Sequence, residues 1–289
     1  MQSVVYQNPI ENIEKLVLSL KQSAALALHD GVVSHITYKI GDCSPSPIIE
    51  DPQLWATQNS DDAISIEYQY FDHNYGHGGG QNELAKNASA QILGIINPDV
   101  VASPHLIEIL CQEFHDEQVG IAEAAQIPFE HPKSYDIETR ETTFASGCCL
   151  FIDRELFNEI DGFDDEYFFM YCDDVDLSWR VRRAHKKIVF CPDACVYHDH
   201  RLGTDSALEV GAAEFYYSAI GAVMLAYKWN RRDLAERNTA QLRADPSYNE
   251  VVAELDERIR ENRIPDPISD ASRVALFTTH GFAHYRWTH

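Results

Sequence analysis

Apolar runs alternate with amphipathic segments over roughly the first 116 residues of the chain. The run "SVVY" is followed by Gln7-Asn8-Pro9, and "NIEKLVLSLKQSAALAL" then carries apolar residues at helical spacing. Further strands are predicted in "VVSHITYKIGDCS", "AISIEYQYF" and "ILGII", with a helix "ELAKNASAQ" before the last. Ser103 and Pro104 predict the N-cap and first position of a helix "PHLIEILCQEF".

This alternation predicts an α/β fold whose mainly parallel sheet has helices on both faces. Ligands of such sheets bind beyond the carboxyl ends of the strands. We therefore expect the functional loops at Tyr6–Asn8, Asp42–Ser44, Asn74–Asn82 and Asn97–Asp99. The segment "SPSPIIEDPQ" is too rich in proline for regular structure.

The second half of the chain changes character near residue 204. Before it, "TTFASGCCLFI" predicts a buried strand, "DRELFNEI" a short helix, "DVDLSWRVRRAHKK" an amphipathic helix and "CVYH" a short strand. After it, "EFYYSAIGAVMLAYKW" and "YNEVVAELDERIRENR" predict only helices. We expect an α/β domain over residues 1–204 and a C-terminal helical extension over residues 205–289.

Charge limits the classes of partner. The formal net charge is −23, from 46 acidic against 23 basic residues. This field repels nucleic acids and anionic lipid headgroups, so we expect no nucleic-acid partner. Clusters of carboxylates can still recruit a divalent cation, which can in turn bring in an anionic ligand.

The N-terminal segment "MQSVVYQNPIENIEKL" has neither a basic n-region nor an apolar h-region, and no apolar run approaches the length of a membrane span. These features predict a cytoplasmic protein without a transmembrane segment. Seven cysteines, an odd number scattered through apparent core segments, suit reduced thiols better than a disulfide framework.

Two segments could carry ligand chemistry, and each has a structural alternative. The glycine-rich "NYGHGGGQN" precedes a helix whose N-terminus could face an anion, although the same glycines suit a tight turn. Asp99, in "INPDV", follows a strand where a carboxylate could bind Mg²⁺ or Mn²⁺. The alternative is a turn in which Asp99 bonds its own backbone.

Three acids, Asp173, Asp174 and Asp176, fall at the predicted start of a helix. Capping of free N–H groups and the helix dipole account for one of them. The surplus suits a general base or a site that a cation approaches.

The segment "CPDACVYHDH" offers Cys191, Cys195, His198 and His200. A zinc site is disfavoured, because this spacing matches no common zinc module and strand alternation sends Cys195 and His198 to opposite faces. His198 acting with Asp99 on one cation is the preferred interpretation.

Together these segments resemble a known family. The stretches "NYGHGGGQNELAKNA", "ILGIINPDV" and "SGCCLFIDRELFNEIDGFDDEYFFMYCDDVDLSWRVRRAHKKIVFCPDACVYHDH" resemble, in order and spacing, the family 2 glycosyltransferases of the GT-A fold, especially the rhamnosyltransferase-like branch. The resemblance covers about residues 3–200. It implies a Rossmann-like GT-A domain that binds a nucleotide-sugar donor and a divalent metal, Mn²⁺ or Mg²⁺, and transfers the sugar to an acceptor hydroxyl with inversion.

The resemblance also assigns roles to residues. Asp174 matches the catalytic base, with Asp173 as the first member of the acidic pair, where glutamate is usual. Asp99 and His198 match the metal ligands. The donor site matches Tyr6, Asp42, Asn74, Gly76, Gly80, Asn82 and Asn97.

The branch suggests dTDP-rhamnose as donor, with UDP-sugars as the second choice and a glycan or lipid-linked sugar as acceptor. A different interpretation keeps the fold without turnover, as a non-catalytic nucleotide-sugar-binding or regulatory protein. The apolar C-terminal helix "YYSAIGAVMLAY" could pack on the first domain, form a homodimer contact or touch a lipid-linked acceptor at the inner membrane face, and packing is preferred.

Overall fold

The fold is built around one eight-stranded sheet. The computed structural model describes residues 1–130, 133–198, 211–278 and 281–282. The strand order is β3-β2-β1-β4-β7-β6-β8-β5, and four of the seven pairings are parallel. The strands are β1 (Gln2–Val5), β2 (Thr37–Asp42), β3 (Ser65–Tyr70), β4 (Ile92–Ile96), β5 (Val100–Ala102), β6 (Val119–Ile127), β7 (Cys149–Asp153) and β8 (Lys187–His198).

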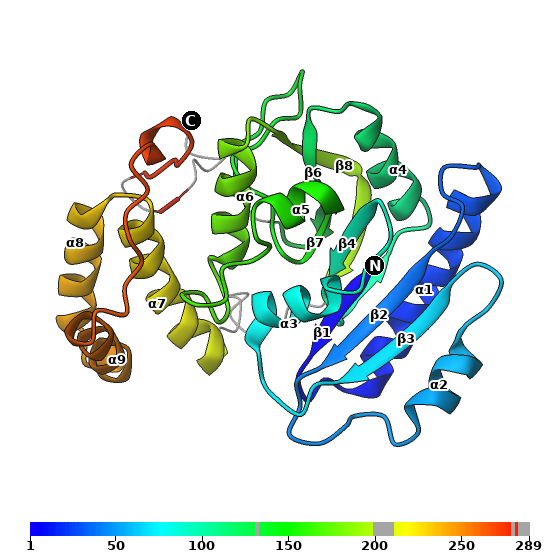
Figure 1. Ribbon diagram of the computed structural model, residues 1–289, viewed down its shortest axis with the longest axis horizontal. Helices are drawn as coiled ribbons and strands as arrows, with labels where there is room; N and C mark the ends of the chain where they lie inside the picture. Colours follow the sequence, from blue (N-terminus) through cyan, green and yellow to red (C-terminus); the bar gives the residue numbers. More distant parts are fainter. Residues whose placement is uncertain (131–132, 199–210, 279–280, 283–289) are drawn as a thin grey trace.

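Helices cover both faces of this sheet (Figure 1). They are α1 (Ile10–His29), α2 (Pro52–Asn59), α3 (Gly76–Ala85), α4 (Leu106–Gln112), α5 (Arg154–Glu159) and α6 (Asp173–Arg183). Neighbouring residues of one strand enter different cores: Cys149 and Phe151 pack with α1 and α4, whereas Leu150 and Ile152 pack with α5 and α6. This is the two-residue period of a strand buried on both faces, and the predicted α/β fold is confirmed.

Three further helices, α7 (Ala212–Lys228), α8 (Arg232–Arg243) and α9 (Asn249–Arg260), lie on the far side of α6 from the sheet (Figure 1). A third core joins them to α6, where the Trp179 and Trp229 rings meet edge to face with centroids 5.3 Å apart. The apolar face of α7 therefore packs on the first domain, the preferred one of its three interpretations. The predicted boundary at residue 204 lies outside the described residues.

A buried charge network fastens α7 to α6. Asp176 is fully buried and accepts hydrogen bonds from Lys228 Nζ (2.8 Å), Arg180 Nε (2.8 Å) and Trp229 Nε1 (3.0 Å). Burial alone would raise the pKa of Asp176, but Arg180 and Lys228 hold it below its ordinary value. The third acid of the 173–176 cluster thus has a structural role.

Several segments differ from the sequence-based expectations. The glycine-rich segment forms the first turns of α3, and α2 starts at Pro52 inside the stretch judged too rich in proline. α4 starts at Leu106, because Ser103 pairs with Cys195 of β8 through its backbone N–H and its hydroxyl instead of capping the helix. β8 is longer than the predicted "CVYH", and β6 and α8 were not predicted.

Short 3₁₀ turns at Glu113–His115, Pro246–Tyr248 and Ala271–Arg273 complete the regular structure of the described residues. All seven cysteines are free thiols, as expected. None of the helices that the structure describes combines the length and the apolar character needed to cross a bilayer.

Candidate active site

Strand pairing brings Asp99 and His198 together from distant parts of the sequence. Val100 of β5 is the antiparallel partner of His198 at the end of β8, so Asp99 emerges beside that histidine. His198 Nε2 lies 3.5 Å from Asp99 Oδ1, with 12% and 37% of the two side chains exposed. The two predicted metal ligands thus share one end of the sheet, within reach of solvent on the Asp99 side.

The other ring nitrogen of His198 is held inside the protein. Nδ1 lies 3.2 Å from Gln126 Oε1 and 3.4 Å from Cys148 Sγ. Because the amide oxygen can only accept, a proton on Nδ1 satisfies it and leaves Nε2 as the acceptor nitrogen on the Asp99 side. Gln126, which is 6% exposed, therefore sets the tautomer that a metal ligand needs.

The zinc interpretation gains no support. Cys191 is buried beside Arg140, and the Cys195 thiol contacts the carbonyl of Pro192. His200 lies outside the described residues. Within the described part of the chain, no three His, Cys, Asp or Glu side chains are grouped so that they could hold a metal ion.

The acidic pair sits at the start of α6, as predicted. Asp173 is 3% exposed, whereas Asp174 is half-buried and therefore open to a substrate. Asp174 accepts hydrogen bonds from the backbone N–H groups of Gly147 at Oδ2 (2.9 Å) and Val175 at Oδ1 (2.8 Å). Burial and the neighbouring Asp173 raise the pKa of Asp174 to about 6, against the lowering effect of the Gly147 N–H and of His77.

A histidine that the sequence analysis did not single out completes this cluster. His77, from the first turn of α3, places Nδ1 2.6 Å from Asp173 Oδ2. Burial acts to lower the pKa of His77, but Asp173 and Asp174 outweigh it and raise the pKa above its ordinary value. In the sequence, His77 is marked only by being a polar residue within a run of glycines.

Two consecutive residues connect the acidic cluster to the Asp99–His198 pair. Gly147 holds Asp174 through its N–H, and Cys148 contacts His198 through its thiol. Buried Glu123 supports this turn, since it accepts from the Ser146 N–H (2.7 Å) and is paired with Lys133 at 2.6 Å. The candidate base and the candidate metal ligands therefore lie on either side of one short, rigidly held turn.

The predicted donor-site residues at the ends of β1 and β2 lie around a hollow of about 290 Å³. Tyr6, Cys43 and Asn74 line it, and the Tyr6 side chain is 47% exposed. Asp42 lies beneath and is fully buried: it accepts from the N–H groups of Ser44 (2.8 Å) and Ile48 (2.9 Å) and from the hydroxyl of Tyr68. Asp42 thus shapes the wall of the hollow, and a direct contact to a nucleotide stays a prediction.

The other predicted donor-site residues are engaged in packing. A methyl group on Gly80 would lie 2.6 Å from the Val4 side chain, and one on Gly76 would lie 2.1 Å from the Phe169 carbonyl oxygen. Asn82 exchanges two 2.8 Å hydrogen bonds with the backbone of Phe163. These residues hold α3 against β1 and against the segment 163–169 that precedes α6, and donor contacts from them stay predictions.

Asn97 sits at the end of β4, where its backbone N–H donates to the Cys148 carbonyl (2.8 Å). That bond ties the Asn97–Asp99 loop to the same turn that carries Gly147 and Cys148.

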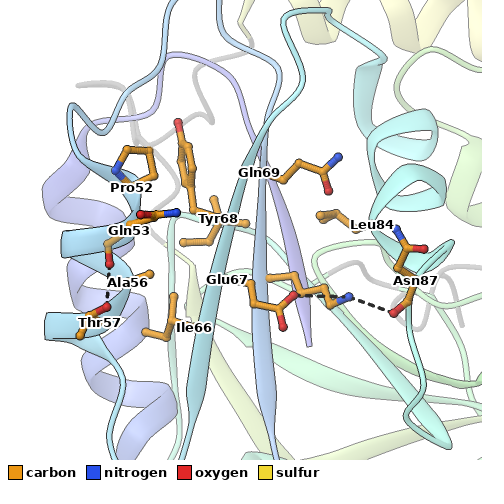
Figure 2. Close-up of a pocket in the computed structure, with 12 residues that line it drawn as sticks. Pro52, Gln53, Ala56, Thr57, Ile66, Glu67, Tyr68, Gln69, Leu84 and Asn87 are labelled. Atoms are coloured by element: carbon orange, nitrogen blue, oxygen red, sulfur yellow. Dashed lines mark hydrogen bonds and ion pairs between the residues drawn. The ribbon is translucent and has the colours of Figure 1, made fainter.

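A larger hollow of about 640 Å³ lies elsewhere, around the edge strand β3 (Figure 2). Figure 2 shows Gln53 and Thr57 of α2 on one side of the strand and Leu84 and Asn87 on the other. None of its twelve lining residues is a predicted site residue. We therefore do not place the chemistry there.

Comparison with solved structures identifies the fold. Crystalline GalNAc-T7 with UDP, GalNAc and Mn²⁺ superposes over 92% of this chain with a TM-score of 0.64, at 12% identity and over 55% of that chain. The chain has the GT-A fold of glycosyltransferases. The mannosyltransferase PcManGT from Pyrobaculum calidifontis, in complex with GDP-Man and Mn²⁺, superposes over 91% of this chain and 70% of that one, with a TM-score of 0.55 and 13% identity.

A sequence relative agrees with the predicted branch. The N-acetylglucosaminyl-diphospho-decaprenol L-rhamnosyltransferase of Mycobacterium tuberculosis (strain ATCC 25618 / H37Rv) is 40% identical over 75 residues. The match spans 25% of this chain and about a quarter, 24%, of that protein's length. No family model matches the chain. The resemblance to rhamnosyltransferase-like GT-A proteins is confirmed.

The sequence analysis missed four residues that contact the acidic pair and His198, namely His77, Gln126, Gly147 and Cys148. Nothing in the sequence pointed to Gln126, because the strand that carries it, β6, was not predicted. Gly147 and Cys148 were interpreted only as part of a buried strand. Their roles depend on partners 27 to 96 positions away in the sequence.

Proposed function

We propose that the protein is a glycosyltransferase that moves a sugar from a nucleotide-sugar donor to an acceptor hydroxyl. The observation that carries the proposal is the turn at Gly147 and Cys148, which holds a half-buried carboxylate on one side and a histidine–carboxylate pair on the other. A general base next to a cation site is what deprotonation of a hydroxyl and departure of a diphosphate require.

Asp174 is the proposed base. It is exposed enough to meet the acceptor, and its raised pKa of about 6 leaves it ionised at neutral pH while making it a better proton acceptor than an ordinary carboxylate. The acceptor oxygen gives its proton to Asp174 as it bonds to the anomeric carbon, and the bond to the diphosphate breaks on the opposite side. This single displacement inverts the anomeric configuration.

Asp99 and His198 fit a divalent cation of the Mn²⁺ or Mg²⁺ kind. A carboxylate and a correctly oriented imidazole face each other at 3.5 Å, and such cations commonly take one or two protein ligands and complete their shell with phosphate oxygens and water. When bound, the cation would offset the negative charge of the diphosphate. It would also explain how a chain of net charge −23 accepts an anionic donor.

The donor is proposed to place its nucleoside in the hollow lined by Tyr6, Cys43 and Asn74. The name of the rhamnosyltransferase relative supports rhamnose as the transferred sugar. The proposed donor is dTDP-rhamnose, with a UDP-sugar as the second choice. The relative's name also supports a lipid-linked N-acetylglucosamine as the acceptor class, which is consistent with a role in polysaccharide or glycan synthesis.

The test is transfer with purified full-length protein. The enzyme, Mn²⁺ and a synthetic prenyl-diphospho-N-acetylglucosamine would be incubated with dTDP-rhamnose or with UDP-sugars, and the product detected by mass spectrometry. Proton NMR of the new linkage reads the anomeric configuration. We expect one donor to be consumed with inversion; consumption of none of them, with this or simpler glycan acceptors, contradicts the proposal and favours a non-catalytic binder.

A further inference from the structure

The position of His77 is more constrained than packing alone requires. Its Nδ1 lies 2.6 Å from Asp173 Oδ2, with 19% and 4% of the two side chains exposed. Its own backbone N–H donates to the Phe169 carbonyl (2.9 Å), and its ring meets the Phe163 ring edge to face with centroids 5.5 Å apart. The imidazole is therefore fixed in place and aimed at the acidic pair.

His77 also lies against the turn that holds Asp174. A methyl group on Gly147 would lie 3.1 Å from His77 Cε1 and 3.6 Å from the Asp174 Cβ. The imidazole is thus hydrogen-bonded to one acid and stands next to the backbone group that positions the other. A side chain in this place acts on both carboxylates at once.

The charges explain what such a residue does. Asp173 and Asp174 are adjacent carboxylates, and Asp173 is almost fully buried, so two like charges at this position favour keeping one of them protonated. Among the residues that the structure describes, Cys148, Cys172 and Tyr171 also interact with the acidic pair, and burial raises the pKa of each above its ordinary value, so they add no charge at neutral pH. Of the described groups that act on the pKa of Asp174, His77 is the one that can carry a positive charge.

We infer that His77 is a positioning residue of the transferase reaction: its imidazolium neutralises Asp173, and this keeps Asp174 free to take the acceptor's proton. The inference rests on the proposed function, in which Asp174 is the base. It assigns the two acids different tasks: buried Asp173 is the partner of His77, and the less completely buried Asp174 meets the substrate. The inference goes beyond the family resemblance, in which His77 had no assigned role.

The test compares His77→Gln, which keeps a donor for Asp173 without the charge, with His77→Phe, which keeps a ring beside Phe163 but loses both. Removal of a cation next to a partly buried acid moves its pKa by about 1 to 2 units. We expect both variants to shift the acidic limb of the kcat–pH profile upward by at least about one unit, with roughly tenfold lower kcat near pH 6. His77→Gln should approach the wild-type rate above about pH 8.5, and His77→Phe should stay lower.

His105→Phe is the matched control. It removes a histidine–carboxylate pair of similar length, His105 Nδ1 to Glu108 Oε2 at 2.8 Å, in which the histidine side chain is 58% exposed and belongs to the start of α4. Its profile should coincide with that of the wild type. An unshifted acidic limb in both His77 variants, or an equal loss of rate at every pH, overturns the inference.

A second readout does not depend on turnover. Histidine ring NMR, with the His77 signal assigned from His77→Phe, should show that the pKa of His77 lies above its ordinary value of about 6.5 in the wild type and returns toward it in Asp173→Asn. If His77 titrates at its ordinary value in both, the inference fails whatever the activity. If the coupling is present but no donor is consumed, the pair stands and the proposed function fails.

Discussion

The backbone N–H of Gly147 donates a 2.9 Å hydrogen bond to Oδ2 of Asp174, and the thiol of the next residue, Cys148, lies 3.4 Å from Nδ1 of His198. One turn between two buried segments thus fixes the candidate base and the candidate metal ligand relative to each other. Chemistry that needs both at a set separation benefits from such a support, because small displacements of catalytic groups are costly.

Asp174→Asn should abolish transfer while leaving nucleotide binding intact. The amide keeps an oxygen for the Gly147 N–H but cannot take a proton, and general-base catalysis contributes about 10²- to 10⁴-fold. The measurement is kcat beside the Kd for the nucleoside diphosphate. The control is Asp165→Asn, which removes an exposed acid in the loop before α6 and should change neither kcat nor Kd. An active Asp174→Asn enzyme removes Asp174 from the base role.

The same substitution should stabilise the fold at neutral pH. Folding raises the pKa of Asp174 from 3.8 to about 6, so the folded state holds its proton more tightly than the unfolded state does. Unfolding free energy is therefore lost as pH rises from about 4 to 6, by roughly 3 kcal/mol at pH 7. Asparagine has no such loss. Urea unfolding should show that the free energy of unfolding of the variant, relative to that of the wild type, is higher at pH 7 than at pH 4. An equal difference at both pH values would refute the raised pKa.

His198→Ala should weaken nucleotide binding only in the presence of the cation. The substitution removes the nitrogen that faces Asp99, and a site with one ligand fewer binds the cation more weakly. Isothermal titration calorimetry with the nucleoside diphosphate, with and without Mn²⁺, measures the change in Kd. We expect at least about a tenfold rise in Kd with Mn²⁺ and little change without it. Equal affinities for variant and wild type in Mn²⁺ would exclude His198 as a ligand.

Lys228→Met should destabilise the whole protein rather than the C-terminal helices alone. It removes the charged partner of the fully buried Asp176 across the α6–α7 contact, and breaking a buried ion pair costs about 3 kcal/mol or more. Denaturant unfolding followed by both tryptophan fluorescence and circular dichroism measures this. Lys86→Met, which removes an exposed pair with Glu83, should change the stability by less than about 1 kcal/mol. Equal stabilities of the two variants would mean that α7 is not fastened through Asp176.

Most strands and helices of the first half of the chain were predictable, because the spacing of apolar residues within each segment indicates its type. The exceptions are α2, β5 and β6. The helical form of the glycine-rich segment was not predictable, since glycine disfavours helices. Packing overrides that preference here: Gly78 and Gly80 allow α3 to approach Phe163 and Val4 more closely than any other residue could. The form of α3 is therefore decided by contacts that the sequence does not show.

The site was predictable where motifs carry it and not where distant partners do. Asp99 and His198 lie beside each other, as a shared cation site would need, and the register of β5 on β8 brings them there; their role as metal ligands stays a prediction. The acids at 173, 174 and 176 looked alike in the sequence. They differ only through partners: His77 for Asp173, the Gly147 N–H for Asp174, and Lys228 for Asp176.

The most direct test of the proposed function is thermal stabilisation by a panel of nucleotides, namely dTDP, UDP, GDP, ADP and CMP, each with and without Mn²⁺. A ligand that binds only the folded state raises the melting temperature by mass action. We expect one diphosphate, dTDP or UDP, to stabilise the wild type only when Mn²⁺ is present, and His198→Ala to lose this effect. Absence of stabilisation by every nucleotide in Mn²⁺ would contradict a nucleotide-sugar transferase at this site.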